Sequence, residues 1–460
     1  MKTLKRAAHL ALALLFFFQL AASAQAPAKK KRPVRPVLPA PKAKEELVKP
    51  EPKTKEDIIK TADRPVPPKE GLIGRILNAI TIDTRHGPVI PFPVGDSSKD
   101  LGPSFGIMPV VALKKKTTGE IKSVLVPSIT YNENLRTTLT YRHYIFPDDK
   151  RYFILRASRS ERVERELMAF YYTPQFLSSS VRLSLEGKHW VTGKPSFYGY
   201  GINSQRGDKA NYALQMTGEE VIADLPLINH LFFNFNHSYF DKRIGPGPVS
   251  NGQVKTDFPA DYAVASEMRT FHTNRFSLVY DDTDHPFLPK IGTYASASVL
   301  YSNKALGSDY EYRTYSLQVK HYYNYKEKGR FVTAAHYLLQ FQRGDTLPFY
   351  AMPQLGESTG LRMTGDGRFT DRGKFVFTIE ERITLSKTPF FHKFISETEI
   401  APFLDVGTVF GKLSDFRAGD LKYGPGVSAR LVIRPQLVAT VDLAYGSEGT
   451  NAIIKIGYPF

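Results

Sequence analysis

The chain has 460 residues, a formal net charge of +17 and no cysteine, so disulfide bonds and thiolate metal sites are excluded. It carries 31 Phe and 25 Tyr at a mean hydropathy of −0.29, a combination typical of sheets whose apolar residues occupy alternate positions. A basic chain can bind nucleic acid, but the export signal described next argues against nucleic acid and favours anionic lipid head groups.

Residues 1–24 have the features of a secretory signal peptide. Lys2 and Arg6 precede an apolar stretch from Leu10 to Leu20, and Ala22-Ser23-Ala24 fits the small-residue cleavage pattern. The apolar stretch is about half the roughly 20 residues that a membrane-spanning helix needs. We therefore predict cleavage after Ala24 rather than a membrane anchor.

Residues 25–70 are rich in Pro and Lys, as in Lys29-Lys30-Lys31-Arg32-Pro33. Such a segment cannot bury enough apolar area to offset its ordering entropy, which predicts a disordered periplasmic tail. The alternative is a tether that contacts peptidoglycan or a periplasmic partner protein.

Residues 71–460 alternate between strand-like segments and turns, which predicts an all-β protein: a transmembrane antiparallel β-barrel. In 329–343, for example, Phe331, Tyr337 and Leu339 share one face and His336 lies on the other. The candidate strands are 103–114, 121–132, 135–145, 150–160, 164–172, 179–187, 210–222, 228–242, 269–281, 292–302, 310–325, 329–343, 374–386, 396–410, 423–434, 436–446 and 451–460. Because bacterial barrels favour even numbers, we expect sixteen strands.

The connections between these segments differ in length. Asn132-Glu133-Asn134 and Arg434-Pro435-Gln436 are short and are predicted to be periplasmic turns. The long connections at 187–209, 243–268 and 344–373 are predicted to be extracellular or folded into the lumen.

The most informative cluster lies at 356–407. A Gly-rich loop presents Arg362 and Arg368 just before a strand that carries Glu380, and the next strand carries Asp405. A guanidinium in a confined lumen requires carboxylates, and its planar fork can hold two carboxylate oxygens at once. The alternative is that these are surface charges with no shared site.

Three other groups of residues have competing interpretations. Asp281, Asp282, Asp284 and His285 fit either a hard-cation site or the polar end of a hairpin, and Pro286 and Gly292 favour the hairpin. Ser277 and His336 lie on strands, but nothing in the sequence pairs them as a lipase would require, so we expect no enzyme and no cofactor. His189 and Trp190 suit a membrane interface.

The end of the chain is a strand with a period of two. Ala452, Ile454, Ile456, Tyr458 and Phe460 occupy one face, and Lys455 occupies the other. This pattern favours the closing strand of an outer-membrane barrel over a strand of a soluble sheet. Pro459 lacks an N–H group and weakens the pairing of this strand.

Several motifs resemble the BamA/TamA-like outer-membrane assembly superfamily, also called the bacterial surface antigen family. Leu361-Arg362 is similar to the tip of its lumen loop, Gly367–Arg372 to the run that follows, and Phe403–Gly407 to a later barrel strand. Glu380-Glu381-Arg382 is similar to the strand between them. The resemblance implies that Arg362 lies in the lumen near Asp405 and Glu380.

Two further stretches are similar to this family: 280–292 to a hairpin and Phe197–Gly201 to a turn. The C-terminal strand, with Ile456, Tyr458 and Phe460, is similar to the family's assembly signal, which implies recognition by the outer-membrane assembly machinery. Two features depart from the family: Met363-Thr364 replaces the Gly-aromatic pair of the tip, and residues 25–70 are too short for a POTRA domain. The resemblance therefore implies a barrel-only member.

These observations predict a barrel in the bacterial outer membrane that contacts its lipid and assists insertion or translocation of proteins or lipids. The alternative is a plugged channel or structural barrel without insertase activity.

Overall fold

The computed structural model describes residues 81–84, 87–114, 121–148, 150–285, 288–325, 330–390, 394–433 and 437–456. The chain divides into two units, 1–67 and 68–460, and every described residue belongs to the second unit. The predicted signal peptide and the Pro/Lys-rich segment lie outside the described residues, as do Tyr458 and Phe460.

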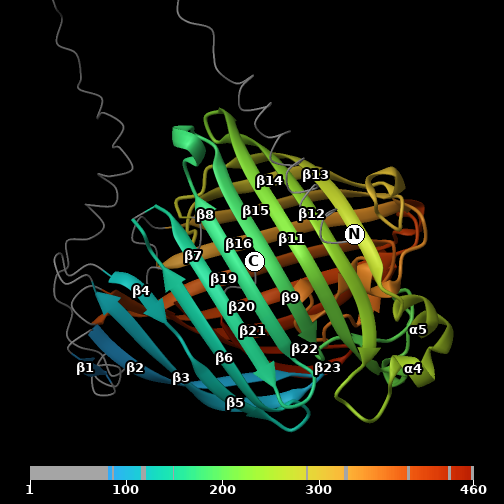
Figure 1. The fold of residues 1–460 in the computed structure, drawn as a ribbon, viewed down its shortest axis with the longest axis horizontal. Helices are drawn as coiled ribbons and strands as arrows, with labels where there is room; N and C mark the ends of the chain where they lie inside the picture. The colour runs from blue at the N-terminus through green and yellow to red at the C-terminus, as the bar shows by residue number, and fades with distance from the viewer. Residues whose placement is uncertain are drawn as a thin grey trace, which may run out of the picture. The chain divides into compact units, whose positions relative to one another are not determined.

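One antiparallel sheet of 21 strands forms most of the described chain (Figure 1). Its first half consists of β1 (Ile82–Thr84), β2 (Gly87–Ser98), β3 (Gly102–Lys114), β4 (Ile121–Leu125), β5 (Ser128–Asn132), β6 (Arg136–Ile145), β7 (Tyr152–Ser160), β8 (Arg165–Thr173), β9 (Arg182–Thr192), β10 (Ser196–Phe197) and β11 (Ala210–Ile228). Its second half consists of β12 (Leu231–Pro246), β13 (Arg269–Asp281), β14 (Gly292–Ser302), β15 (Tyr312–Asn324), β16 (Phe331–Gly344), β19 (Gly373–Phe390), β20 (Phe394–Phe410), β21 (Lys422–Ile433), β22 (Leu437–Gly446) and β23 (Gly449–Ile456).

The remaining elements are short and lie in the connections. A second sheet pairs β17 (Gln354–Leu355) with β18 (Phe369–Thr370). The helices are α4 (Val254–Asp257) and α5 (Pro259–Ala265), and the 3₁₀ turns are η1 (Phe176–Ser178), η2 (Arg206–Asp208), η3 (Lys304–Leu306), η4 (Phe349–Ala351), η5 (Glu357–Thr359), η6 (Leu413–Asp415) and η7 (Ala418–Asp420). Within the described part of the chain, no helix is long and apolar enough to cross a membrane.

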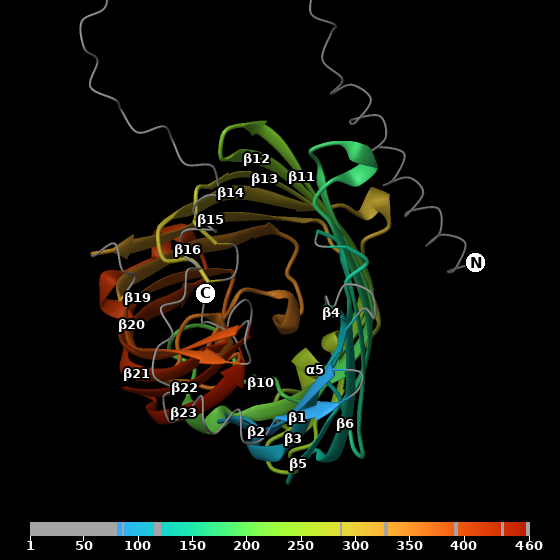
Figure 2. The ribbon, with the colours of Figure 1, turned by 90° about the vertical axis from the view of Figure 1, so that its left-hand side faces the viewer.

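The sheet closes on itself, which confirms the predicted all-β barrel. Successive strands pair around the ring, and β23 returns to β2 through Ser97 opposite Ile454 (Figure 2). Among the described residues, β1 and β10 are short additions and β4 and β5 are two parts of one interrupted strand, so the ring has eighteen positions. This differs from the expected sixteen.

The connections define two ends of the barrel. We call the end with the long connections 193–209, 247–268 and 345–372 the loop end, and the opposite end, with 174–181 and 282–291, the turn end. Asn132-Glu133-Asn134, predicted to be a periplasmic turn, lies at the same end as the long connections, where the Asn132 amide donates to the Leu101 carbonyl at 3.2 Å. Arg434-Pro435-Gln436 lies outside the described residues.

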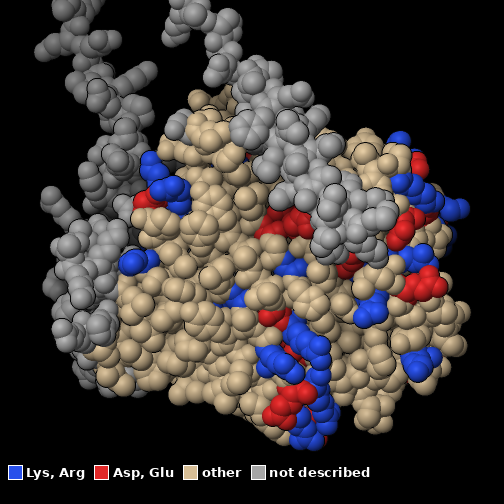
Figure 3. Space-filling view, viewed as in Figure 1, with Lys and Arg blue, Asp and Glu red and all other residues tan. Residues whose placement is uncertain are grey.

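Side chains alternate between the two faces of the wall, as the period-two pattern requires. On β6 the inward Thr138 and Thr140 are buried, whereas the outward Leu139 is 59% exposed. On the face seen in Figure 3, most of the surface over the strands is uncharged, and a large group of charged side chains lies at its lower edge. A closed ring with an apolar exterior pairs its backbone groups internally, which a lipid bilayer demands.

An apolar cluster closes part of the loop end. Phe197 stacks on Phe349 with ring centroids 4.1 Å apart, and Phe271 and Tyr212 complete the buried group. Phe258, just before α5, packs against Phe197. Connections distant in the sequence are thus held together over the lumen.

Candidate functional site

The connection between β16 and β19 folds into the barrel. We call residues 345–372 the lumen loop; its orange-brown segments lie inside the ring in Figure 2. Its tip turns at Gly360, whose φ of 118° lies in the left-handed region that favours glycine. A Cβ at Gly360 would also lie 2.4 Å from Val376 of β19, so glycine lets the loop approach the wall.

Arg362 lies at this tip and is 2% exposed. Its guanidinium holds Asp405 of β20 with two bonds, from Nε to Oδ2 at 2.9 Å and from Nη2 to Oδ1 at 2.8 Å. The Arg362 backbone N–H also donates to Asp405 Oδ2 at 3.0 Å. Paired bonds of this kind fix the orientation of the two groups, so they hold the loop tip in one position on the wall.

Glu380 of β19 joins the lumen loop to the wall. Its Oε2 lies 3.5 Å from Arg362 Nη1 and 2.7 Å from Arg430 Nη2, and its Oε1 accepts from Arg382 Nε at 2.7 Å. One buried carboxylate is therefore shared among three guanidinium groups from a loop and two strands.

Three guanidinium groups and three carboxylates meet in this buried group. Arg362, Arg382 and Arg430 face Glu380, Asp405 and Asp442, whose Oδ1 is 3.8 Å from Arg362 Nη1. The Arg362 guanidinium also lies over the Phe403 ring, 3.3 Å from its centroid. Buried ions persist only when they are paired in this way, so removing any one member leaves an uncompensated charge.

Arg368 has a different partner from the one the sequence suggested. It does not join Asp405 or Glu380; its Nε and Nη2 contact the Glu448 carboxylate at 2.7 and 3.2 Å. Its Nη1 and Nη2 donate to the hydroxyl and carbonyl of Ser204, both at 2.9 Å. Arg368 therefore anchors the far part of the lumen loop to the turn between β22 and β23.

Apolar side chains pack the rest of the lumen loop against the wall. Leu361, Met363 and Phe369 are fully buried and pack in one cluster with Val376 and Phe403 of the wall. Met363 replaces a residue expected from the family motif, and it fills the space beside Gly446, where an added Cβ would lie 1.8 Å from the Met363 sulfur. Glycine in β22 thus makes room for methionine in the loop.

The lumen loop also contacts both sides of the junction between β2 and β23, which we call the seam. On the β2 side, Lys99 Nζ donates to the Met363 carbonyl at 2.7 Å, and Asp100 accepts from the Asp366 N–H at 2.8 Å. On the β23 side, the Asn451 amide donates to the Arg362 and Thr364 carbonyls at 2.9 and 3.0 Å.

One contact crosses the seam directly at its loop end: Lys99 Nζ donates to the Glu448 carbonyl at 3.0 Å. Burial raises the pKa of the Asp100 carboxyl above its usual range, although Lys209 at 3.1 Å and the Asp366 N–H act in the opposite direction.

At the turn end, the connection 282–291 reaches the same wall strands. Lys290 Nζ lies 3.1 Å from Glu397 of β20, and Arg382 Nη1 donates to the Pro289 carbonyl at 3.3 Å. Leu288 packs against Val432 and Val438. Because Arg382 also holds Glu380, polar contacts run continuously from the lumen loop to this turn.

The residues considered for a metal site, a lipase or a membrane interface have the following surroundings. Within the described residues, no group of three or more His, Cys, Asp or Glu side chains is arranged to hold a metal. His336 Nε2 contacts Gln318 at 3.0 Å, and Ser277 contacts Asn234 at 3.5 Å, so these two residues have separate neighbours. His189 contacts Thr217 at 2.8 Å. A cavity of about 240 Å³ lies beside Arg362 and Lys374.

The C-terminal residues are described as far as Ile456, which pairs with Ala439 of β22. Ala452 and Ile454 lie on the more exposed face of β23, whereas Asn451 and Ile453 are buried.

Fold and buried charges together define an outer-membrane β-barrel whose lumen holds an arginine-tipped loop. Residues 151–436 match the Omp85 superfamily domain, and the chain belongs to this superfamily. This confirms the resemblance seen in the sequence and places the protein in the bacterial outer membrane.

One of the solved structures compared here supports the fold. The crystal structure of BamA from Haemophilus ducreyi lacking POTRA domains 1–3 aligns with 83% of this chain and 76% of that chain, at 13% identity and a TM-score of 0.50. CdiB from Acinetobacter baumannii aligns with 80% of this chain and 59% of that chain, at 9% identity and a TM-score of 0.43. No curated protein sequence matches the chain.

Proposed function

We propose that this barrel assists insertion or translocation of proteins or lipids at the outer membrane by parting at the seam, and that it catalyses no chemical reaction. The observation that carries the proposal is the sparse pairing between β2 and β23 within the described part of the chain. Among described residues, Ser97 opposite Ile454 is their one registered pair, whereas β20 pairs with β21 from Ser396 opposite Ile433 to Gly407 opposite Lys422.

The sequence of β2 explains this weakness. β2 contains Pro88, Pro91 and Pro93, and a proline has no N–H group to donate to a neighbouring strand. Prolines are tolerated on edge strands because they blunt pairing. Within the described residues the wall is continuous elsewhere and sparsely bonded here, and we propose that it separates at this line first, which would give a client access from the lumen to the bilayer.

A disulfide across the seam tests this proposal. Ser97 and Ile454 are directly opposite, and opposite residues of antiparallel strands lie about 4.5–5.5 Å apart at Cα, within the range that a disulfide spans. The natural chain has no cysteine, so S97C/I454C adds one defined crosslink. In cells lacking the gene, we expect the oxidised double variant not to restore outer-membrane protein and lipid composition, and reductant to restore it.

The matched control is S298C/S316C, which crosslinks β14 to β15 in the continuous part of the wall. This control should behave like the natural protein with or without reductant. Full restoration by the oxidised seam variant, or an unchanged composition when the gene is deleted, would contradict the proposal.

A second candidate function is a plugged channel or structural barrel. It is favoured by the lumen loop, which occupies the barrel with buried charges and apolar side chains. Planar-bilayer recording separates the two: a steady, substrate-selective current supports the channel, and flickering or absent current supports the first proposal.

The proposed partners follow from the two ends of the chain. We propose that the assembly machinery engages the C-terminal residues Ile456, Tyr458 and Phe460, and that residues 25–70 contact a periplasmic partner. Pull-down from outer membranes with and without residues 25–70 tests the second contact.

A further inference from the structure

The wall next to the seam contains a row of prolines. Pro91 of β2 lies opposite Pro109 of β3. The pairs Val111–Leu125 and Ile107–Ile129 on either side place Pro109 opposite Pro127, at the break between β4 and β5. Each proline removes a ladder donor, so three successive strand positions are loosely bonded at one level of the wall.

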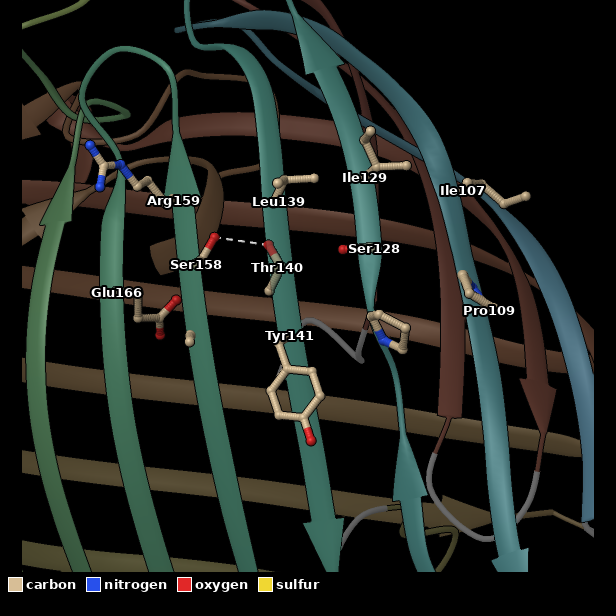
Figure 4. A pocket seen from close by; sticks show the side chains of 12 residues that line it. Ile107, Pro109, Ser128, Ile129, Leu139, Thr140, Tyr141, Ser158, Arg159 and Glu166 are labelled. Atoms are coloured by element: carbon tan, nitrogen blue, oxygen red, sulfur yellow. Dashed lines mark hydrogen bonds between the residues drawn. The ribbon is translucent and has the colours of Figure 1, made fainter. Parts of the chain in front are cut away.

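A groove of about 550 Å³ lies at this row. Pro109, Pro127 and the small Ala157 line it together with the larger Ile107, Ile129, Leu139 and Tyr141 (Figure 4). The large side chains face outward: Ile107 is 48% and Ile129 46% exposed. The groove is therefore part of the membrane-facing surface, and its lining suits an acyl chain.

The row of outward residues ends in two arginines. Leu139 of β6 lies opposite Arg159 of β7, which lies opposite Arg165 of β8. Both arginines are exposed, and Arg159 also lines the groove. Like charges directly opposite each other in a sheet are destabilising unless an anion lies between them.

No carboxylate of the described residues forms an ion pair with either arginine. Glu166, the neighbour of Arg165 in sequence, also lines the groove, and its carboxylate pairs with Arg156 at 3.0 Å. Glu161, in the β7–β8 turn, accepts from the Thr137 N–H at 3.3 Å. Arg162 adds a further exposed cation to the same turn. In Figure 3, basic and acidic side chains gather at the lower edge of the largely uncharged wall.

We propose that this surface binds a phosphorylated, multiply acylated lipid of the lipid A type. One acyl chain occupies the groove over Pro109 and Pro127, and a head-group phosphate lies between Arg159 and Arg165. The planar guanidinium matches phosphate oxygens in pairs, which relieves the repulsion between the two arginines. The site lies at the loop end, and long loops of outer-membrane barrels face outward, so the bound lipid belongs to the outer leaflet.

Native mass spectrometry of the full-length protein in detergent tests the head-group contact, with bisphosphorylated lipid A as the probe. We expect R159Q/R165Q to bind lipid A with an apparent affinity about tenfold weaker than that of the natural protein, because two charge-assisted contacts are lost. The matched control is R151Q, which removes an exposed arginine of the turn end that pairs with Asp148. Heat-modifiable migration on a gel verifies that each variant is folded.

A second variant tests the groove without changing charge. A157F fills the groove floor and should also weaken lipid A binding, whereas A297F, on the outward face of β14 opposite Leu278, should not. Lipid A binding that is unchanged in both R159Q/R165Q and A157F would overturn the proposal. Equal binding of dephosphorylated lipid A would overturn the phosphate contact, and equal binding of phosphatidylglycerol would overturn the assignment to lipid A.

Discussion

Arg362 is the residue on which the seating of the lumen loop depends most. Its side chain ties the loop tip to Asp405, to Glu380 and, more distantly, to Asp442. These carboxylates belong to three different strands, β19, β20 and β22. Loss of the guanidinium would therefore leave several wall strands with unbalanced charge at once.

We expect R362A to destabilise the folded barrel by about 3–5 kcal/mol, the cost of breaking a buried ion pair by removing one partner. R362K should recover only part of this loss, because an ammonium cannot hold both Asp405 oxygens as a fork. The measurement is the temperature at which the folded band disappears on a gel. The control R151A should leave that temperature unchanged, and an unchanged value for R362A would show that the buried pairs do not stabilise the barrel.

Asp100 gives a prediction about pH. Because burial raises its pKa in the folded state, the folded protein binds this proton more tightly than the unfolded chain does. The resulting stabilisation is fully present below the unfolded pKa and is lost as pH rises through the folded pKa. We expect D100N to melt higher than the natural protein at neutral pH and this advantage to disappear on acidification.

The neighbouring Lys209, which pairs with Asp100 at 3.1 Å, provides the control. K209A removes an opposing cation and should raise the pKa of Asp100 further, so the pH dependence of melting should move to higher pH. A constant difference between D100N and the natural protein at every pH would contradict the prediction.

Part of the site could be predicted from the sequence, and part could not. Arg362, Glu380 and Asp405 lie within one continuous motif-bearing region, so their types and order pointed to one another. Arg368 meets Glu448 and Ser204, which are 80 and 164 residues away, and no local pattern marks such partners. Asp442 had a usable signal, since it is the one acidic residue of β22.

At the scale of elements, the connection 282–291 links strands that are distant in the sequence, as the lumen loop does. It leaves β13 at the turn end and meets β19 through Arg382 and β20 through Glu397. Asp284 organises this connection by accepting from the Lys290 and Ile291 N–H groups at 2.8 and 3.2 Å.

We expect K290A to loosen this connection, because Glu397, 3% exposed at its side chain, loses a nearby cation. Hydrogen exchange at the Lys290 position and Ile291 amides should become about tenfold faster as the open form is populated. The control K304A removes an exposed cation that pairs with Asp345 at the loop end. Equal exchange in K290A and the natural protein would contradict the prediction.

Strands with strict alternation were predictable, whereas β2, with three prolines among its twelve residues, was not. The segments 329–343 and 436–446 correspond to β16 and β22, because packing and lipid contact select one side-chain type on each face. β2 was missed, since its three prolines obscure a strand pattern that its neighbour β3 nevertheless stabilises. Pairing between strands decides such cases, and a single segment carries little information about its neighbours.

At the scale of the whole molecule, the strand number illustrates the same limit. The count of sixteen followed from a preference for even numbers, and a ring of eighteen positions satisfies that preference equally. Closure depends on the register between many strands, which sequence periodicity does not specify.

The predicted division of the chain has its own test. If the signal peptide is cut after Ala24, the mature protein begins at Gln25. We expect the intact mass of protein purified from outer membranes to correspond to residues 25–460. Recovery of the full 460-residue mass from that membrane would contradict the predicted cleavage.

The lumen loop holds both edges of the seam through Lys99 and Asp100 on one side and Asn451 and Glu448 on the other. Separation of those edges consequently requires the loop to be withdrawn first, which makes residues 345–372 a point of control reached from the cell exterior. Under the proposed function, an antibody fragment that binds the loop in this position would keep the seam closed from outside the cell, without contacting the client.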